Sequence, residues 1–349
     1  MREAAIHLVI VLISLMFAGF AQASTWNRVG NDNACRIQIP YLTGDIYPDL
    51  KEQKSVRGCL NWGFFAEFLW VLNHLDWCEK TNQIPVVYWD SRFAYYSKDG
   101  YNGSFNCWEY YFEPVSSLIY QPDDNIERRT FYINFSTIWW YAQYIQNMHL
   151  LAPEEQSSIV GVPLPYKLDM DMAYPVKGHL YAHQFRRYVK SLIDKYVALK
   201  PNVQEKIDMF YRSMMEGHKV VGLHLRGSFI WNEVNTVPLE VLCEEANKNA
   251  DENTIFYVAT DQYPLLDSAK KFLNGKVIYY DCYRQTRTTS PSESQQWPPI
   301  MGEDVLVETV LLSLCDHLVH TISNVSTAAL YFNPELPHTM LYCDGRISK

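Results

Sequence analysis

Residues 220–234 read VVGLHLRGSFIWNEV, and this stretch decides the fold class of the chain. Residues 220–225 are mostly apolar, which is typical of a buried strand, and the charged side chain of Arg226 follows at once. In a parallel sheet, ligands bind at the carboxyl ends of the strands. His224 and Arg226 are therefore predicted to face a ligand site at such an end.

Strand and helix patterns alternate through the residues that follow. This repeated β-α-β order predicts a doubly wound α/β sheet. The segment Arg284–Pro299, rich in Ser, Thr, Pro and Gln, interrupts the order and is predicted to be a mobile loop. The predicted strands span residues 220–225, 255–259, 277–280 and 317–321, and the predicted helices span 239–248, 265–272 and 304–314.

The N-terminal half carries a second α/β pattern. Gly58 and Gly63 bracket a turn, a helix is predicted over residues 64–81, and a strand over 85–88. Two further helices, 181–199 and 201–215, are expected to join two domains. The predicted domains cover residues 24–205 and 206–349.

Residues 89–145 are unusually rich in aromatic side chains. Such rings pack in protein cores, and they also stack on the C–H faces of sugars. The segment is interpreted either as core packing or as a surface for a sugar acceptor.

Residues 1–23 resemble an export signal. Arg2 precedes an apolar stretch, and Ala21-Gln22-Ala23 forms a small-x-small cleavage site. The mature chain is therefore expected in a secretory lumen or outside the cell. An uncleaved membrane anchor is the alternative; beyond this stretch no membrane span is predicted.

The composition limits the partners and the redox chemistry. The chain has 349 residues, 48% of them hydrophobic, and a net charge of −9, which argues against nucleic acid and anionic membranes as partners. Eight cysteines behind an export signal suggest some disulfides, although their pairing stays open. Glycosylation sequons occur at Asn102, Asn134 and Asn324.

Polar residues follow three of the predicted strands. Each has an ordinary structural explanation: Arg226 could pair with a carboxylate, His224 could be a hydrogen-bonded core histidine, and Asp261 could cap the next helix. The sequence has neither a GxGxxG motif after a strand nor a P-loop. A guanidinium beside a hydroxyl-rich helix start suits a diphosphate, which points to a nucleotide-sugar.

Three peptides give the chain a family resemblance. LHLRG, YVATDQYPLLDSAKKF and EDVLVETVLLSLCDHLVHTISNVS resemble the three motifs of the fucosyltransferase superfamily. That superfamily includes the α1,6-, nodulation and protein O-fucosyltransferases. The resemblance implies a GT-B-like fold, two Rossmann-like domains with the GDP-fucose cleft between them. It also implies an inverting transfer of fucose to a glycan or glycoprotein acceptor, with no metal and no cofactor.

The resemblance also implies roles for individual residues. Arg226 matches the arginine that binds the β-phosphate of the donor, and His224 and Glu308 match the residues that hold guanine. Glu233 stands five residues before Pro238, as a glutamate of the α1,6 enzymes does before its own proline, and is proposed as the general base; a solvated loop glutamate is the alternative. The remaining expected donor-binding residues are Asp261, Ser323, Asn324, Gly63 and Gly58.

The sequence departs from the family pattern at three positions. Gly227 replaces the second basic residue of the nodulation and α1,6 enzymes, Gln262 replaces an acidic residue, and Glu308 is one methylene longer than the usual aspartate. These departures keep a second reading open, a protein that binds a glycan or nucleotide without turnover. A hydrolase is the third reading, for which neither GxSxG nor HExxH is present.

One motif suggests a metal site. Asp169-Met-Asp171 has the DxD form that holds divalent ions in other glycosyltransferases. It falls between the predicted domains and not after a Rossmann strand, and is interpreted as a solvated loop.

Overall fold

The structure is a computed structural model that describes residues 34–38 (backbone only), 63–82, 84–89, 91, 93–118, 183–227, 237–284, 297–321 and 323–341. Residues 1–23, Gly58, the motif Asp169–Asp171 and Glu233 lie outside the described residues.

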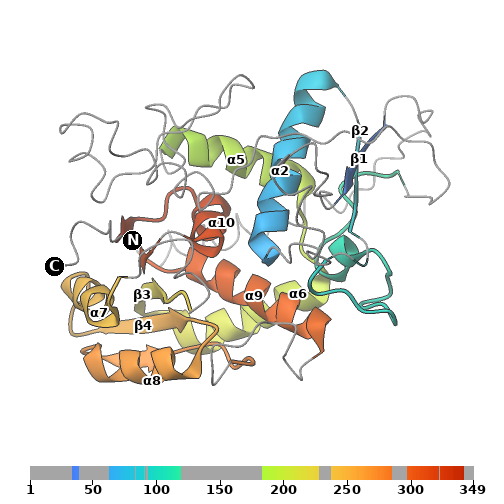
Figure 1. The fold of residues 1–349 in the computed structure, drawn as a ribbon. Helices are drawn as coiled ribbons and strands as arrows, with labels where there is room; N and C mark the ends of the chain where they lie inside the picture. The colour runs from blue at the N-terminus through green and yellow to red at the C-terminus, as the bar shows by residue number, and fades with distance from the viewer. Residues whose placement is uncertain are drawn as a thin grey trace, which may run out of the picture.

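A parallel five-stranded sheet organises the C-terminal half (Figure 1). Its strands follow the order β5-β4-β3-β6-β7. The inner strand β4 is buried at all six positions, as expected for a parallel strand covered on both faces. The strands are β3 (Lys219–His224), β4 (Thr254–Ala259), β5 (Lys276–Ile278), β6 (His317–His320) and β7 (His338–Met340).

Helices cover both faces of this sheet. Neighbouring strand residues point to opposite faces, so Val220 joins one hydrophobic cluster and Val221 the other. Helices α7 and α8 pack in the Val221 cluster, and α9 and α10 in the Val220 cluster. These helices are α7 (Leu239–Lys248), α8 (Tyr263–Phe272), α9 (Pro298–Ser313) and α10 (Asn324–Phe332).

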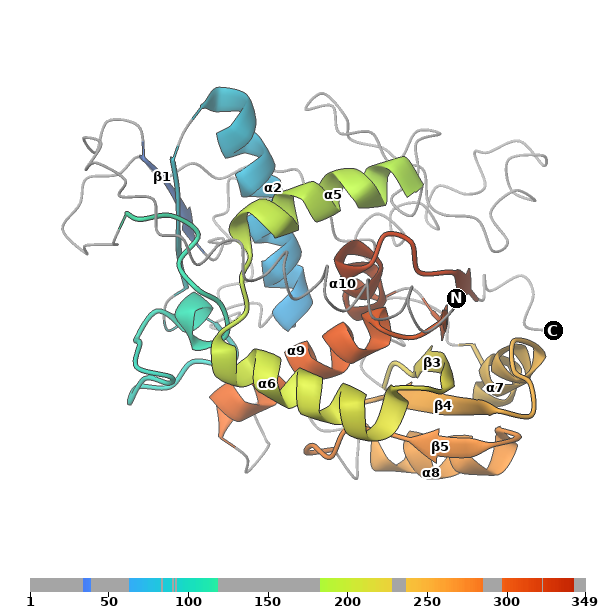
Figure 2. The ribbon, with the colours of Figure 1, turned by 180° about the vertical axis from the view of Figure 1, so that it is seen from behind.

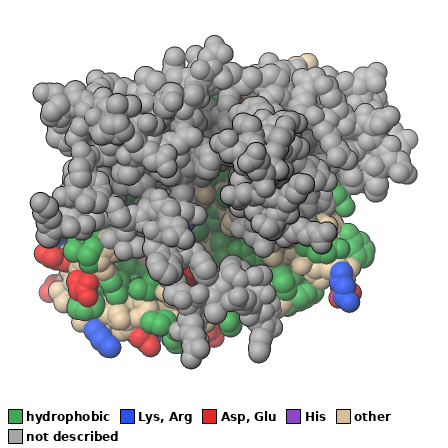
Figure 3. Space-filling model, viewed as in Figure 1, with side chains coloured by type: hydrophobic (Ala, Val, Ile, Leu, Met, Phe, Trp, Pro, Cys, Tyr) green, Lys and Arg blue, Asp and Glu red, His purple; other side chains and the backbone are tan. Residues whose placement is uncertain are grey.

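The outer faces of α7 and α8 meet solvent. In the space-filling view, charged side chains of both signs lie along the lower margin, where Figure 1 places these two helices (Figure 3). Both helices are therefore amphipathic, with one face in the core and one in water.

The strand order creates a switch point beside β3. From β3 the chain moves outward through β4 and β5, and α9 then returns it to the other side of β3, where β6 pairs. Crossovers therefore leave β3 and β6 in opposite directions, which opens a crevice at their carboxyl ends. His224 and His320 end these two strands and lie opposite each other in the register.

The N-terminal half contributes a small parallel sheet and several helices. β1 (Ala34–Gln38) pairs with β2 (Ile84–Tyr88), and α2 (Phe64–Thr81) precedes β2. Helix α2 ends at Asn82, whose φ of 52° lies in the left-handed region that asparagine tolerates. The other elements are η3 (Cys107–Tyr110), α5 (His183–Tyr196), α6 (Pro201–Phe210) and η5 (Tyr211–Met215).

One aromatic core joins the two halves. Phe68 of α2 stacks with Trp108 and Phe112 and also with Phe332 at the end of α10. Figure 2 shows α5 crossing α2 and α6 lying along α9. In the described part of residues 89–145, most aromatic side chains are buried, so core packing is the interpretation that holds there. Helix α6 runs through residues 205 and 206, where the sequence places the domain boundary.

The elements differ from the prediction at four places. Helix α9 begins at Pro298, six residues before the predicted start, because proline fits the first turn of a helix. Arg284, the first residue of the predicted mobile loop, is 4% exposed. Helix α8 begins at Tyr263 with Gln262 as its N-cap, so the explanation of Asp261 as a cap is wrong. Strand β7 was not predicted.

The described cysteines and the sequon residue Asn102 bear on the disulfides and glycans expected from the sequence. No disulfide is seen among the described residues, and Cys243, Cys282 and Cys315 carry free thiols. The Nδ2 group of Asn102 donates to the carbonyl of Tyr110 at 2.7 Å, so this sequon amide is engaged in the fold. The described residues therefore give no support to the predicted disulfides or to a glycan at Asn102. None of the described helices is long and apolar enough to cross a membrane.

Candidate functional site

A cavity of about 310 Å³ lies at the carboxyl ends of β3 and β4. The first turn of α2 forms another part of its wall, together with α9 and the first turn of α10. Six of the residues predicted from the sequence line this cavity: Gly63, His224, Arg226, Asp261, Glu308 and Asn324. The sheet thus brings together residues that are up to 261 positions apart in the chain.

Two helix N-termini meet at the cavity. Gly63 caps α2, and the space where a side chain would extend from it is open. Ser323 caps α10 from a buried position, where its Oγ accepts a hydrogen bond from the Val325 amide at 3.2 Å. Because helix N-termini carry partial positive charge and amide donors, this wall favours an anion.

Arg226 adds a full positive charge to the same cavity. The amide of Leu225 donates to the Ala259 carbonyl at 2.9 Å, which continues the pairing of β3 and β4 and positions the next residue at the sheet edge. Arg226 is half-buried, and it is the one arginine or lysine among the described residues that line the cavity. A guanidinium beside two helix N-termini is an arrangement suited to a diphosphate.

His224 lines the cavity as a neutral imidazole. It is 7% exposed, and its Nδ1 lies 2.8 Å from the Oγ of Ser326. Burial, His320 and Arg226 together lower the pKa of His224 to about 3. The histidine is therefore hydrogen-bonded in the core, as the structural explanation expected, and it also faces the ligand space.

Asp261 and Gly227 lie against each other. The Asp261 carboxylate accepts a hydrogen bond from the Gly227 amide. A Cβ atom at Gly227 would come within 2.2 Å of the Asp261 Oδ1. The side chain of Asp261 is open to the cavity, but the surrounding protein displaces water and raises its pKa. Any larger residue at 227 would have to displace this carboxylate, which gives a physical reason for the glycine there.

Glu308 forms a buried ion pair beside the cavity. Its Oε1 lies 2.5 Å from Nη2 of Arg284, and the two side chains are 11% and 1% exposed. Burial raises the pKa of Glu308 to about 8, and the Arg284 guanidinium acts in the opposite direction. The predicted acceptor of guanine N–H groups therefore faces the cavity with a positive partner.

Two cavity residues were missed in the sequence. Asp304 lies one helical turn before Glu308 in α9, and burial and the neighbouring Glu303 raise its pKa to about 6. The i, i+4 spacing within the predicted helix could have placed both carboxylates on one face. Tyr95, a hydrogen-bond partner of the Phe64 backbone, also lines the cavity. Its position depends on packing between distant segments, so no local pattern could have found it.

The described part of the chain contains no candidate metal centre. Among the described residues, no group of three or more His, Cys, Asp or Glu side chains could hold a metal ion. The DxD motif Asp169–Asp171 and the predicted base Glu233 lie outside those residues, as does Gly58.

Comparisons with known proteins find similarity in structure. No family model matches the sequence, and neither does any curated protein. The structure is similar to NodZ α-1,6-fucosyltransferase soaked with GDP-fucose, with 17% identity, a TM-score of 0.46, and coverage of 79% of this chain and 90% of the other.

Two further solved structures are similar in the same way. Fucosyltransferase NodZ from Bradyrhizobium has 16% identity, a TM-score of 0.44, and coverage of 77% of this chain and 88% of its own. POFUT1 in complex with GDP-fucose has 12% identity, a TM-score of 0.32, and coverage of 44% and 49%.

Proposed function

We propose that this chain is a glycosyltransferase that moves fucose from GDP-fucose to a hydroxyl group of a glycan or glycoprotein. The observation that carries the proposal is the single cavity that contains Arg226, His224, Glu308 and two helix N-termini. An anion site next to a hydrogen-bond acceptor for a base matches the two ends of a nucleoside diphosphate.

The diphosphate would lie against Arg226 and the first turns of α2 and α10. The open space at Gly63 would let phosphate oxygens approach the backbone amides at the start of α2. Asn324 lines the cavity at the start of α10 and would lie beside the same phosphates. As the bond to the sugar breaks, negative charge collects on GDP, and Arg226 would stabilise that charge in the transition state.

The guanine would lie against His224 and Glu308. An ionised carboxylate can accept from both N–H groups on one edge of guanine, a pattern that adenine and uracil do not present. The neutral imidazole of His224 offers one further hydrogen-bonding nitrogen without adding charge.

The transfer would be a single inverting displacement. The acceptor oxygen attacks C1 of fucose, the bond from C1 to the β-phosphate oxygen breaks, and GDP leaves with the electron pair. The acceptor proton passes to a base, for which Glu233 is the candidate. The charge on GDP would be neutralised by Arg226 and helix dipoles, with no need for a metal ion.

The first test is nucleotide binding to the mature chain. We expect GDP and GDP-fucose to raise the melting temperature and UDP to leave it unchanged; a ligand at 100 times its dissociation constant adds about 2.7 kcal/mol to stability. Arg226→Ala should lose most of this shift. Arg187→Ala is the matched control, because Arg187 is 60% exposed on α5 and does not line the cavity. Equal shifts in both variants would show that Arg226 does not contribute to nucleotide binding.

The second test is turnover. Release of GDP from GDP-fucose in the presence of acceptor glycans should persist with a chelator. Loss of activity with a chelator, restored by Mn²⁺, would instead favour the Asp169–Asp171 motif. Glu233→Gln should lower kcat more than it changes GDP affinity if Glu233 is the base.

One observation favours a second candidate, a protein that binds nucleotide or glycan without turnover. Arg226 is accompanied by Gly227 where related enzymes carry a second basic residue, so a leaving diphosphate would meet less positive charge. GDP binding without any GDP release from GDP-fucose, across a panel of acceptors, would support this candidate.

The proposed setting is the secretory lumen. The export signal predicted at residues 1–23 would deliver the chain to a compartment that must import its nucleotide-sugar. Secretion of the chain, and its N-terminal residue after secretion, would test the cleavage expected before Ser24.

A further inference from the structure

Arg284 is held in one orientation by contacts on several sides. Its Nη1 donates to the carbonyls of Tyr280 at 2.9 Å and Cys282 at 3.3 Å. Its guanidinium carbon lies 5.3 Å from the centroid of the Tyr279 ring. These contacts fix the plane of the guanidinium, and with it the direction of the bond to Glu308.

Glu308 and Arg284 differ in their access to the ligand. Glu308 lines the cavity, whereas Arg284 is not one of the described residues that line it. The arginine is 1% exposed at its side chain and contacts the Glu308 carboxylate through Nη2 at 2.5 Å. Arg284 therefore has no direct access to a ligand in the cavity, and its one ion pair with a cavity-lining side chain, among the described residues, is with Glu308.

We propose that Arg284 is a positioning residue that sets the base selectivity of the cavity by orienting the Glu308 carboxyl group and favouring its ionised form. The inference rests on the proposed function, because it assumes that Glu308 accepts N–H groups of guanine. It goes beyond that function by assigning the selectivity to a residue that does not touch the nucleotide.

The physical reason lies in the two states of the carboxyl group. An ionised carboxylate accepts at both oxygens, whereas a protonated one presents a donor in place of one acceptor. Burial favours the protonated form of Glu308, and Arg284 favours the ionised form. Without Arg284 the pKa of Glu308 would rise further, so that at a given pH a larger share of the carboxyl groups would hold a proton and could not accept from both N–H groups of guanine.

Other charged or titratable groups also act on Glu308. Asp304 lies on α9 itself, Asp261 follows β4, and Cys282 precedes Arg284 in the chain. Tyr257 of β4 and Tyr280 after β5 are further neighbours. Within this set, Arg284 is the one cation, so its removal should be the main cause of any change in the pKa of Glu308.

The experiment compares GDP with IDP, which lacks the 2-amino group, by calorimetry. At pH 8.5, where most of Glu308 is ionised, the wild type should bind GDP at least about tenfold more tightly than IDP, the range for a hydrogen bond to a charged group. Arg284→Met should reduce this ratio to below about threefold. Arg284→Lys should retain part of it, because lysine keeps the charge but not the planar fork.

Inorganic pyrophosphate serves as the base-free control. Arg284→Met should leave pyrophosphate affinity within about twofold of the wild type, whereas Arg226→Ala should weaken it. The GDP affinity of the wild type should rise from pH 6 to 8.5 as Glu308 ionises, and the rise should move to higher pH in Arg284→Met.

A double variant keeps the test decisive if Arg284→Met alone does not fold, since a buried carboxylate without its partner is costly. Glu308→Gln and Arg284→Met/Glu308→Gln should show the same low GDP/IDP ratio. A lower ratio in the double variant would mean that Arg284 acts independently of Glu308, which overturns the inference.

Two other outcomes separate the inference from the proposed function. A full GDP/IDP ratio in folded Arg284→Met would overturn the inference and leave the GDP site intact. A wild type that binds pyrophosphate but does not distinguish GDP from IDP or UDP would overturn the assignment of a guanine site and the inference with it.

Discussion

At Gly302, in the second turn of α9, the absence of a side chain permits two tyrosines to pack against the helix. A Cβ atom there would lie 2.3 Å from the hydroxyl oxygen of Tyr111 and 3.0 Å from Cγ of Tyr95. Tyr111 cannot easily move, because its hydroxyl donates to the Pro299 carbonyl at 3.1 Å. The φ of Gly302 is not in the left-handed region, so backbone conformation does not require a glycine here. The close approach of the two tyrosines does.

Gly302→Ala should therefore lower the free energy of unfolding. The higher helix propensity of alanine alone would raise the free energy of unfolding by about 1 kcal/mol. Overpacking would lower it by about 1–3 kcal/mol, because the added methyl group overlaps rigid rings. We expect a net loss of about 1–2 kcal/mol in urea unfolding. The double variant Gly302→Ala/Tyr111→Phe should lose less than the sum of the single variants. A Gly302→Ala protein as stable as the wild type would contradict the close approach.

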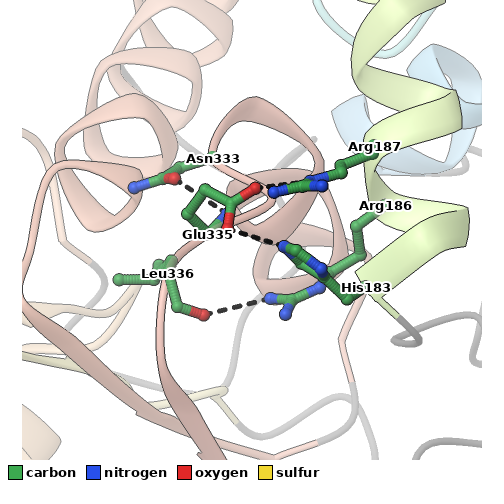
Figure 4. A network of polar contacts seen from close by, with 6 residues as sticks. All are labelled: His183, Arg186, Arg187, Asn333, Glu335 and Leu336. Atoms are coloured by element: carbon green, nitrogen blue, oxygen red, sulfur yellow. Dashed lines mark hydrogen bonds and ion pairs between the residues drawn. The ribbon is translucent and has the colours of Figure 1, made fainter.

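At the scale of elements, α5 is attached to the turn after α10 by two kinds of contact. Figure 4 shows His183 and Arg187 directed at the carboxylate of Glu335, and Arg186 directed at the carbonyl of Leu336. The contacts of Glu335 are exposed, whereas Arg186 is 8% exposed. These contacts join residues about 150 positions apart and hold α5 on the C-terminal half.

Arg186→Met should cost more stability than Glu335→Gln. Loss of the 3.0 Å bond from Arg186 would leave the Leu336 carbonyl without that buried donor, at about 1–3 kcal/mol. Exposed ion pairs contribute about 0.2–1 kcal/mol each, so Glu335→Gln should cost less. Unfolding in urea at low and high salt would check this, because salt should reduce only the Glu335 contribution. Equal losses of unfolding free energy in the two variants would show that burial does not determine how much each contact contributes to stability.

The order of elements was largely predictable. Helices α2 and α7 begin and end at the predicted residues, because their periodicity is local. Helix α9 and strand β7 were not placed correctly, since the first is buried on most sides and the second has only three residues. Such elements are stabilised by their neighbours and carry little pattern of their own.

At the scale of the whole molecule, stability should depend on pH through buried neutral histidines. His320 is 0% exposed; its Nδ1 faces the Thr321 carbonyl at 2.9 Å, and its Nε2 lies 3.1 Å from Nδ1 of His338. Because a carbonyl only accepts, Nδ1 of His320 carries the proton and Nε2 accepts from His338. Burial lowers the pKa of His320 to about 4, of His224 to about 3 and of His338 to about 2.

The sign of the pH effect follows from these directions. In the unfolded chain, histidine binds protons below about pH 6.5, while the folded chain keeps these three neutral, so the unfolded state gains protons first. The three histidines should therefore contribute most to the free energy of unfolding above pH 6.5, and their contribution should fall as the pH decreases, by about 2 kcal/mol per histidine between pH 7 and pH 5. The raised pKa values of Glu308 and Asp304 act in the opposite direction over this range.

Urea unfolding across this range would measure the effect. His320→Gln should reduce the slope against pH, and His218→Gln, at an exposed position, should leave it unchanged. A slope against pH that is the same in His320→Gln as in the wild type would contradict neutral burial of His320.

The cavity depends on the whole molecule because its walls come from both halves of the chain. The start of α2 reaches the carboxyl ends of β3 and β4 only because the aromatic core around Phe68 joins α2 to α10. No segment of the sequence contains this arrangement.

The sequence by itself determined the α/β class, the strand that ends at His224 just before Arg226, and several of the residues that line the cavity. These follow from local periodicity and from the rule that parallel strands present their carboxyl ends together. Only the tertiary structure decided which residues share the cavity: the ion pair of Glu308 with Arg284, the approach of Asp261 to Gly227, and the placement of Tyr95. These contacts join residues distant in the chain, and their energies come from burial and charge, which no local pattern encodes.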